Sequence, residues 1–157
     1  MWIGKRCAQG KTMGAERVEK DVVFATATTG AAASKRLFTV TGCVALTVVA
    51  LCTTDLVAAV GGATLEVGLT GATAVLIAQT TAENIDADEV WTAAAPATKY
   101  AAITDLIPVW YIVNTGIHVL YTVATQAVAT GAIRFICFWE PISEDGYVEA
   151  AGVNAAA

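Results

Sequence analysis

The chain has 157 residues, of which 56% are hydrophobic and 15% are charged, and a formal net charge of −5 at pH 7. This length fits one domain with a sizeable core, but the charged fraction is well below the ~25% of ordinary globular proteins. Because few charged groups are available to cover the surface, we expect part of it to be buried against other subunits, with a membrane protein as the competing explanation.

Basic residues gather at the start of the chain. Residues 1–36 hold seven basic and three acidic side chains, a net charge of +4, whereas the remainder carries a net charge of −9. A basic arm before an acidic body suggests docking on an acidic surface such as a neighbouring subunit, and a solvated tail is the alternative. We predict an extended basic arm and linker over residues 1–33, with a short strand at residues 22–24. The candidate contact residues are Trp2, Lys5, Arg6, Lys11, Arg17, Lys20, Lys35 and Arg36.

The next segment, residues 37–56, is the longest patterned hydrophobic block. It has no charged residue before Asp55 and meets the length criterion for a membrane span. However, Phe38 and Val40 alternate with Thr39 and Thr41, which is the period of a strand. The threonines make no polar stripe at helical spacing, and Val and Thr favour strands. We therefore predict a strand or a bent strand pair that is central to the domain.

Later strands are expected where short apolar runs lie between turn residues. Gly61-Gly62 and Thr130-Gly131 predict hairpins, and the polar segment 80–89 predicts a surface loop. Turn signals recur roughly every 8–15 residues without a long helical pattern, which predicts an all-β fold, either a β-sandwich or a jelly-roll-like barrel. The expected strands are residues 56–60, 64–70, 75–78, 90–91, 117–123 and, as the final strand, 133–139.

Few residues suggest chemistry. His118 is the single histidine, and no serine or cysteine is linked to it in sequence. Asp86 and Asp88 would share a face of an extended chain, but they lack the calcium-loop pattern, so a solvated acidic turn is the favoured interpretation. The four cysteines lack metal-site spacing and are expected to be small buried hydrophobes. We expect no enzymatic activity, no cofactor and no metal.

Two stretches resemble small structural proteins of tailed-phage virions: SKRLFTVTG at 34–42 and ATGAIRFICFWEPISEDG at 129–146, followed by a short Ala-rich tail. The resemblance covers roughly residues 34–148 and leaves the basic arm outside. It implies a β domain over 34–148, an Ala-rich tail over 149–157, and a non-enzymatic virion component. The closest role is a capsid decoration (cement) protein, located on the capsid surface and bound to the major capsid protein.

The composition agrees with that role, because a surface of Ala, Thr and Val packs closely without desolvating many charges. An arm can also add a strand to a neighbouring sheet. The expected partners are the major capsid protein and further copies of the chain, with a trimer as one arrangement, and neither nucleic acid nor a membrane. Another virion component (tail tube, head–tail adaptor or fibre base) is the alternative. A small integral membrane protein is less favoured, since Pro108, Asn114 and His118 would interrupt a span over 106–133.

Overall fold

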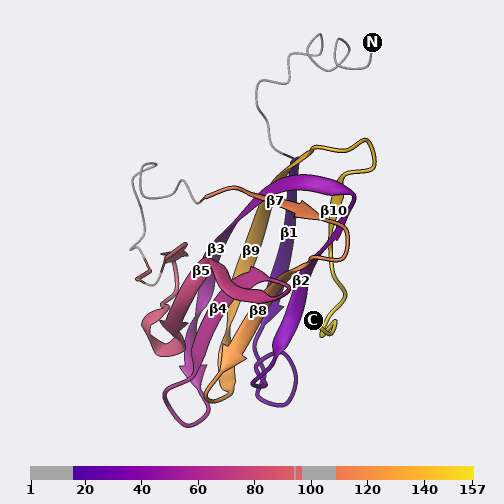
Figure 1. The fold of residues 1–157 in the computed structure, drawn as a ribbon. Coiled ribbons are helices and arrows are strands. Elements are labelled where there is room, and N and C mark those ends of the chain that lie inside the picture. Colours follow the sequence, from indigo (N-terminus) through magenta and orange to yellow (C-terminus); the bar gives the residue numbers. More distant parts are fainter. Residues whose placement is uncertain (1–15, 94, 97–108) are drawn as a thin grey trace.

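The computed structural model describes residues 16–93, 95–96 and 109–157. Over these residues the chain forms strands and one 3₁₀ turn, so the prediction of an all-β fold is confirmed (Figure 1). The elements are β1 (Glu16–Val23), β2 (Ser34–Thr41), β3 (Cys43–Ala58), β4 (Thr64–Leu69), β5 (Ala72–Thr81), η1 (Ala82–Asn84), β6 (Val90–Trp91), β7 (Tyr111–Asn114), β8 (Val119–Ala124), β9 (Val128–Pro141) and β10 (Tyr147–Ala150).

The strands form two antiparallel sheets. Sheet A has the order β1-β9-β3-β6, with β7 also paired to β3, and sheet B has the order β10-β2-β8-β4-β5. Without β6 and β10, the two orders are β1-β9-β3-β7 and β2-β8-β4-β5, which is the strand order of a jelly roll. The two sheets face each other and are not joined into one closed sheet. Of the two predicted forms, the fold is therefore a β-sandwich and not a closed barrel.

The block at residues 37–56 is a bent strand pair, as predicted. β2 lies in sheet B and β3 in sheet A, and Gly42 joins them with a φ of 64°. A left-handed conformation of this kind suits glycine because it has no Cβ. Along β3, buried residues alternate with less buried ones, as the period of two requires.

Aromatic side chains fill the core between the sheets. The rings of Phe24 and Tyr121 meet edge-on with centroids 5.9 Å apart, and Tyr121 stacks on Phe135 at 6.1 Å. The Tyr121 hydroxyl donates a hydrogen bond to the Thr29 carbonyl at 2.9 Å, so its polar atom is satisfied. Burying each such side chain stabilises the fold by about 1.5–3 kcal/mol.

The first described strand belongs to the domain, although its residues were predicted to be part of an arm and linker over 1–33. β1 pairs with β9 along its whole length, from Glu16 opposite Trp139 to Val23 opposite Ala132. The short strand expected at residues 22–24 thus begins six residues earlier. Lys20 occupies an inward position between Val18 and Val22, and this interrupts the apolar alternation that would have indicated a strand.

Both predicted hairpins are wrong, although each glycine signal marks a special backbone conformation. Gly61 and Gly62 have positive φ, but they lead the chain from β3 in sheet A to β4 in sheet B. Gly131 lies inside β9, with a φ of 118°, where a Cβ would meet the backbone of Asp55 and Leu56. Among the described strands, β4 and β5 alone are consecutive in the chain and paired as a hairpin, around Gly71.

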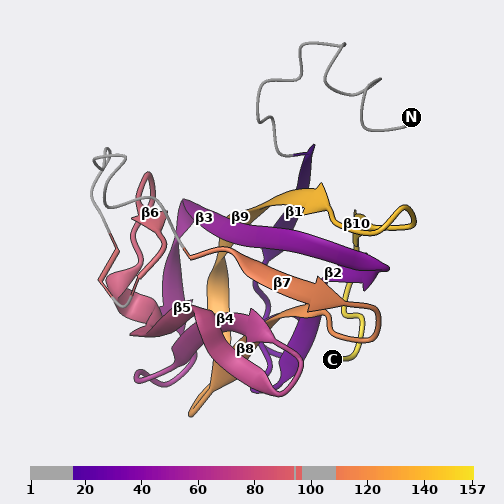
Figure 2. The same cartoon turned by 45° about the horizontal axis from the view of Figure 1, so that its top comes forward.

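The C-terminal residues continue the sandwich, so the strand predicted over 133–139 is not the final one. β10 pairs with β2, and the tail then follows β2 further. The amide of Ala151 donates to the Leu37 carbonyl, and the amide of Arg36 donates to the Ala155 carbonyl, both at 2.9 Å. Figure 2 shows this yellow segment beside β2.

The loop predicted over residues 80–89 begins later than expected. β5 continues to Thr81, and Ala82 and Ile85 are fully buried. The Thr80 hydroxyl is also buried, where it accepts a hydrogen bond from the indole Nε1 of Trp91 at 2.9 Å. Trp91 lies in the predicted short strand at residues 90–91, which is confirmed as β6.

Candidate functional site

The outer face of sheet A, which points away from the core, carries a run of apolar side chains. Leu46, Val48 and Ala50 of β3 are buried on the inner face. Because successive residues of a strand point to opposite sides, the residues between them point outward. There Val49 lies opposite Ile136 of β9, and both are half-buried. The centre of the outer face is therefore apolar.

Strand β7, which pairs with β3, adds Ile112 to this face, and Ile112 is the most exposed apolar side chain there. Ile112 pairs with Ala45 of β3 and is 70% exposed. Val109 and Trp110, which precede β7, are also exposed. A cluster of large apolar side chains at the surface is typical of a contact site. We define the outer apolar face by six residues: Ala45, Val49, Leu51, Ile112, Ile136 and Phe138.

A polar group lies unpaired within the outer apolar face. Thr47, opposite Phe138, is 3% exposed, and its Oγ1 is buried without a hydrogen-bond partner among the described residues. A buried unsatisfied polar group costs about 1–3 kcal/mol. This unsatisfied hydroxyl lies beneath the apolar surface of the face and adds no polar group to that surface.

The β6 end of the face is hollowed. Leu51 and Thr53 of β3, together with Asp88, Glu89 and Val90, line an open hollow of about 520 Å³. In the acidic turn beside the hollow, a Glu89 carboxylate oxygen accepts a hydrogen bond from the backbone amide of Asp86 at 3.0 Å. This hydrogen bond stabilises the turn. No group of metal-ligating side chains occurs among the described residues, Asp86 and Asp88 included.

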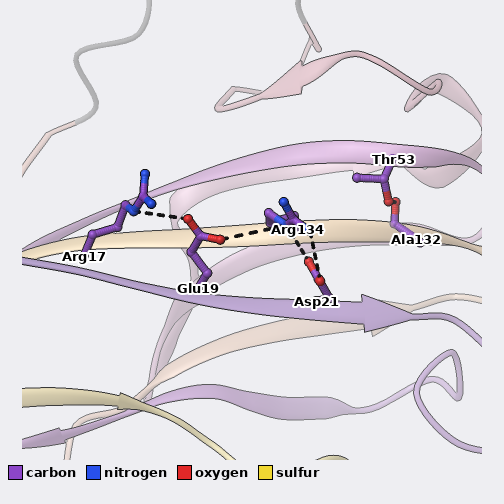
Figure 3. A network of polar contacts seen from close by, with 6 residues as sticks. All are labelled: Arg17, Glu19, Asp21, Thr53, Ala132 and Arg134. Carbon is purple, nitrogen blue, oxygen red and sulfur yellow. Dashed lines mark hydrogen bonds and ion pairs between the residues drawn. The ribbon is translucent and has the colours of Figure 1, made fainter.

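Ion pairs frame the outer apolar face on the β1 side (Figure 3). Arg134 of β9 donates two hydrogen bonds to Asp21 of β1, at 2.8 and 3.1 Å. Glu19 lies between Arg134, at 4.0 Å, and Arg17, at 3.1 Å. The hydrogen bond from Arg134 holds the pKa of Asp21 below its usual value, against a smaller opposing effect of burial. The four charges neutralise one another and leave little free charge.

The structure separates the predicted contact residues. Trp2, Lys5, Arg6 and Lys11 lie outside the described residues. Arg17 is on the outer face of sheet A, paired with Glu19. Lys20 and Lys35 instead occupy positions that face the sandwich interior, and Lys35 is only 8% exposed. Arg36 follows on β2, and its Nε is buried without a hydrogen-bond partner. Of the four predicted contact residues that the structure describes, Arg17 thus points away from the core and the two lysines point into the sandwich.

His118 supports the backbone. Its Nδ1 accepts a hydrogen bond from the amide of Val40 at 3.3 Å, which joins the start of β8 to β2. Burial, and next the positive charge of Arg36, lower the pKa of His118. The ring is therefore neutral at pH 7, as an acceptor must be.

The cysteines within the described residues are mostly buried. Cys52 and Cys137 lie in the core, and burial raises the pKa of Cys52 to about 11 and that of Cys137 to about 12. Cys43 is half-buried. Because the thiolate is the reactive form, Cys52 and Cys137 are unreactive at neutral pH, and the prediction that cysteines serve as small buried hydrophobes holds for these two.

The outer apolar face had a sequence signal. Residues 133–139, apart from Arg134, are apolar at both alternating positions, which means that one set must point away from the core. Ile136 and Phe138 belong to that outward set. Ile112 had no such signal, because β7 has only four residues.

Comparisons of this chain with protein-family models, curated proteins and solved structures found no match. No helix in the described part of the chain is long and apolar enough to cross a membrane.

Proposed function

We propose that this protein is a non-enzymatic structural component of a tailed-phage virion, a capsid decoration protein that binds the lattice of major capsid protein and stabilises the shell. In this proposal the outer apolar face is the surface that meets the lattice. The resemblance of residues 34–42 and 129–146 to virion structural proteins supports the class of protein. The outer apolar face is the observation that carries the proposed mode of attachment.

Burial of this face would drive attachment. Removing apolar surface from water stabilises a complex by about 25 cal/mol per Å², and specific interfaces combine an apolar centre with a polar rim. The half-buried Val49 and Ile136 would form the centre, and the ion pairs of Arg17, Glu19 and Arg134 would form part of the rim. Because these charges are already paired, contact with a partner at the rim does not bury an unpaired charge.

The lattice itself would strengthen a modest contact. When copies of the chain also contact one another, each copy on the shell holds its neighbours at high effective concentration. A decoration protein with a small apolar face can then cover the shell fully. Self-association on the shell, for example as a trimer, is part of the proposal.

Substitution of Ile112 tests the mode of attachment. We expect Ile112→Asp to lower the occupancy of the chain on purified shells at least tenfold, because a carboxylate would be buried in an apolar contact. Occupancy is measured from the protein ratio in purified particles. Val60→Asp is the matched control: Val60 is 79% exposed in the connection between β3 and β4, away from the outer apolar face.

Equal occupancy of the two variants would contradict attachment through the outer apolar face. Circular dichroism of both variants checks that the sandwich is retained. Labelling of the chain across the whole shell supports the decoration role, whereas labelling at one vertex or on the tail would favour a connector or tail component instead.

A further inference from the structure

Strands β1 and β2 and the C-terminal segment lie on one side of the sandwich (Figure 2). Side chains of these three segments line a basic cavity. Its volume is about 200 Å³. It is separate from the outer apolar face, since it opens between the two sheets. Its lining includes Lys20, Thr29, Lys35, Tyr121, Val153 and Asn154.

Both lysines occupy positions where an apolar residue is expected. Lys20 lies opposite Phe135 in the pairing of β1 with β9, and Lys35 lies opposite Tyr121 in the pairing of β2 with β8. Phe135 and Tyr121 are core residues. Residues that are directly opposite in an antiparallel pair share a face, so Lys20 and Lys35 point between the sheets from opposite layers.

The ammonium groups of Lys20 and Lys35 use only some of their N–H donors in hydrogen bonds to described residues. Lys20 Nζ donates to the carbonyls of Arg36 and Gly152, at 2.9 and 3.0 Å. Lys35 Nζ donates to the carbonyl of Ala31 at 2.8 Å and lies 5.8 Å from the centre of the Tyr121 ring. Each ammonium has three donors, so within the described part of the chain one donor of Lys20 and two of Lys35 remain for a ligand.

The two lysines are not held by ion pairs within the described residues. Neither forms an ion pair with a described carboxylate, and Asp21, which borders the cavity, is held by Arg134. Burial lowers the pKa of both Lys20 and Lys35. Lys35 is buried and Lys20 is half-buried. Because buried charges in proteins are normally paired or bound to a counter-ion, an anion in the cavity would complete the surroundings of Lys35.

We propose that this cavity binds a carboxylate carried on a small apolar group. The two carboxylate oxygens would accept hydrogen bonds from the free donors of Lys20 and Lys35. Val22 and Val153 offer apolar surface to the group that bears it. The cavity is smaller than the ~300–1,000 Å³ of sites for drug-sized ligands, so the group has only a few carbon atoms. It is either a free short-chain acid or an acidic side chain of a partner, and only the second source rests on the proposed function.

Titration of the full chain with sodium isovalerate, a short branched carboxylate, tests the site. We expect saturable NMR shifts at Lys20, Lys35 and Val153, and none with isoamyl alcohol, which has the same carbon skeleton without the charge. Ionic strength is held constant with sodium chloride. Lys35→Met, which keeps the length of the side chain, should weaken binding at least tenfold. Arg17→Met is the matched control, because it removes one positive charge from an exposed position outside the cavity, and it should bind as the wild type does.

The absence of saturable shifts, identical shifts with the alcohol, or equal weakening by Arg17→Met would overturn the proposal. Shell occupancy of Lys35→Met then identifies the source of the carboxylate. Reduced occupancy indicates an acidic side chain of the partner, and unchanged occupancy indicates a free acid. Because Ile112→Asp tests the virion role separately, failure of one proposal is distinguishable from failure of the other.

Discussion

At the scale of single residues, Gly68 allows β5 to pack closely against β4. Gly68 is buried opposite Leu120 of β8, and a Cβ at this position would collide with the backbone of Ala72 and Thr73. Its φ is not in the left-handed region, so close approach of β5 is what requires glycine here. Packed interiors have no room for an added methyl group unless the backbone moves.

We predict that Gly68→Ala destabilises the fold by about 2 kcal/mol or more, which is the range for overpacking that shifts the backbone. Gly152→Ala is the control. Gly152 is exposed, its φ is not in the left-handed region, and nothing lies within 4 Å of a Cβ added there. Urea unfolding followed by circular dichroism gives both values. Equal stability of the two variants would show that β5 does not approach β4 so closely.

The burial of Lys35 also leads to a prediction of how the free energy of unfolding depends on pH. Burial lowers its pKa from 10.5 in the folded chain, so the unfolded chain binds more protons between the folded pKa and 10.5. The charged ammonium therefore penalises folding at neutral pH, and this penalty disappears as the pH rises through that window. We expect the free energy of unfolding of Lys35→Met, relative to that of the wild type, to fall as the pH is raised toward 10.5 through the window between the folded and unfolded pKa of Lys35.

The same pH series on Arg17→Met is the reference, because arginine stays protonated throughout this range. Its difference from the wild type should not change with pH. A flat difference for Lys35→Met would mean that burial of Lys35 does not disfavour its charge.

At the scale of elements, local patterns predicted strands but not their partners. The alternation of apolar residues with Thr identified the pair β2 and β3, and the turn Asn114-Thr115-Gly116 lies between β7 and β8. That turn, like Gly61-Gly62, joins strands of different sheets. A glycine signal is a property of a few residues, whereas pairing depends on contacts between distant strands. The sequence therefore indicated a sandwich without fixing which strands lie side by side.

The candidate site was predicted less well for a related reason. Charge composition grouped Arg17, Lys20 and Lys35 as one contact set, but strand alternation sends Arg17 outward and the two lysines inward. A count of charged residues does not show to which side of a sheet each side chain points. Once β1 is recognised as a strand, its period of two gives the correct division.

Adjacent residues of β1 test that this strand belongs to the core. Val22 is 3% exposed and Val23 is 69% exposed. We predict that Val22→Ala lowers the free energy of unfolding by about 1–3 kcal/mol, through lost burial and the space left behind, and that Val23→Ala changes it by about 0.5 kcal/mol or less. Thermal or urea unfolding measures both, and a small, equal effect of the two substitutions would mean that β1 lies outside the core as an arm.

At the scale of the whole molecule, sheet A presents a charged edge beside an apolar face. The edge strand β1 carries the paired charges of Arg17, Glu19 and Asp21, which oppose strand addition along that edge. The outer face of sheet A is apolar beside it. A sandwich with one protected edge and one apolar face is suited to face-on docking, in which the strands lie against the partner instead of extending its sheet.

A single-particle electron microscopy map of a tailed-phage particle that carries this chain tests the central claim most directly. We expect a sandwich on the shell, repeated over the lattice, with Val49, Ile112 and Ile136 of the outer apolar face against the major capsid protein. A map in which this face is open to solvent, or in which the chain occupies a site away from the shell, would contradict it.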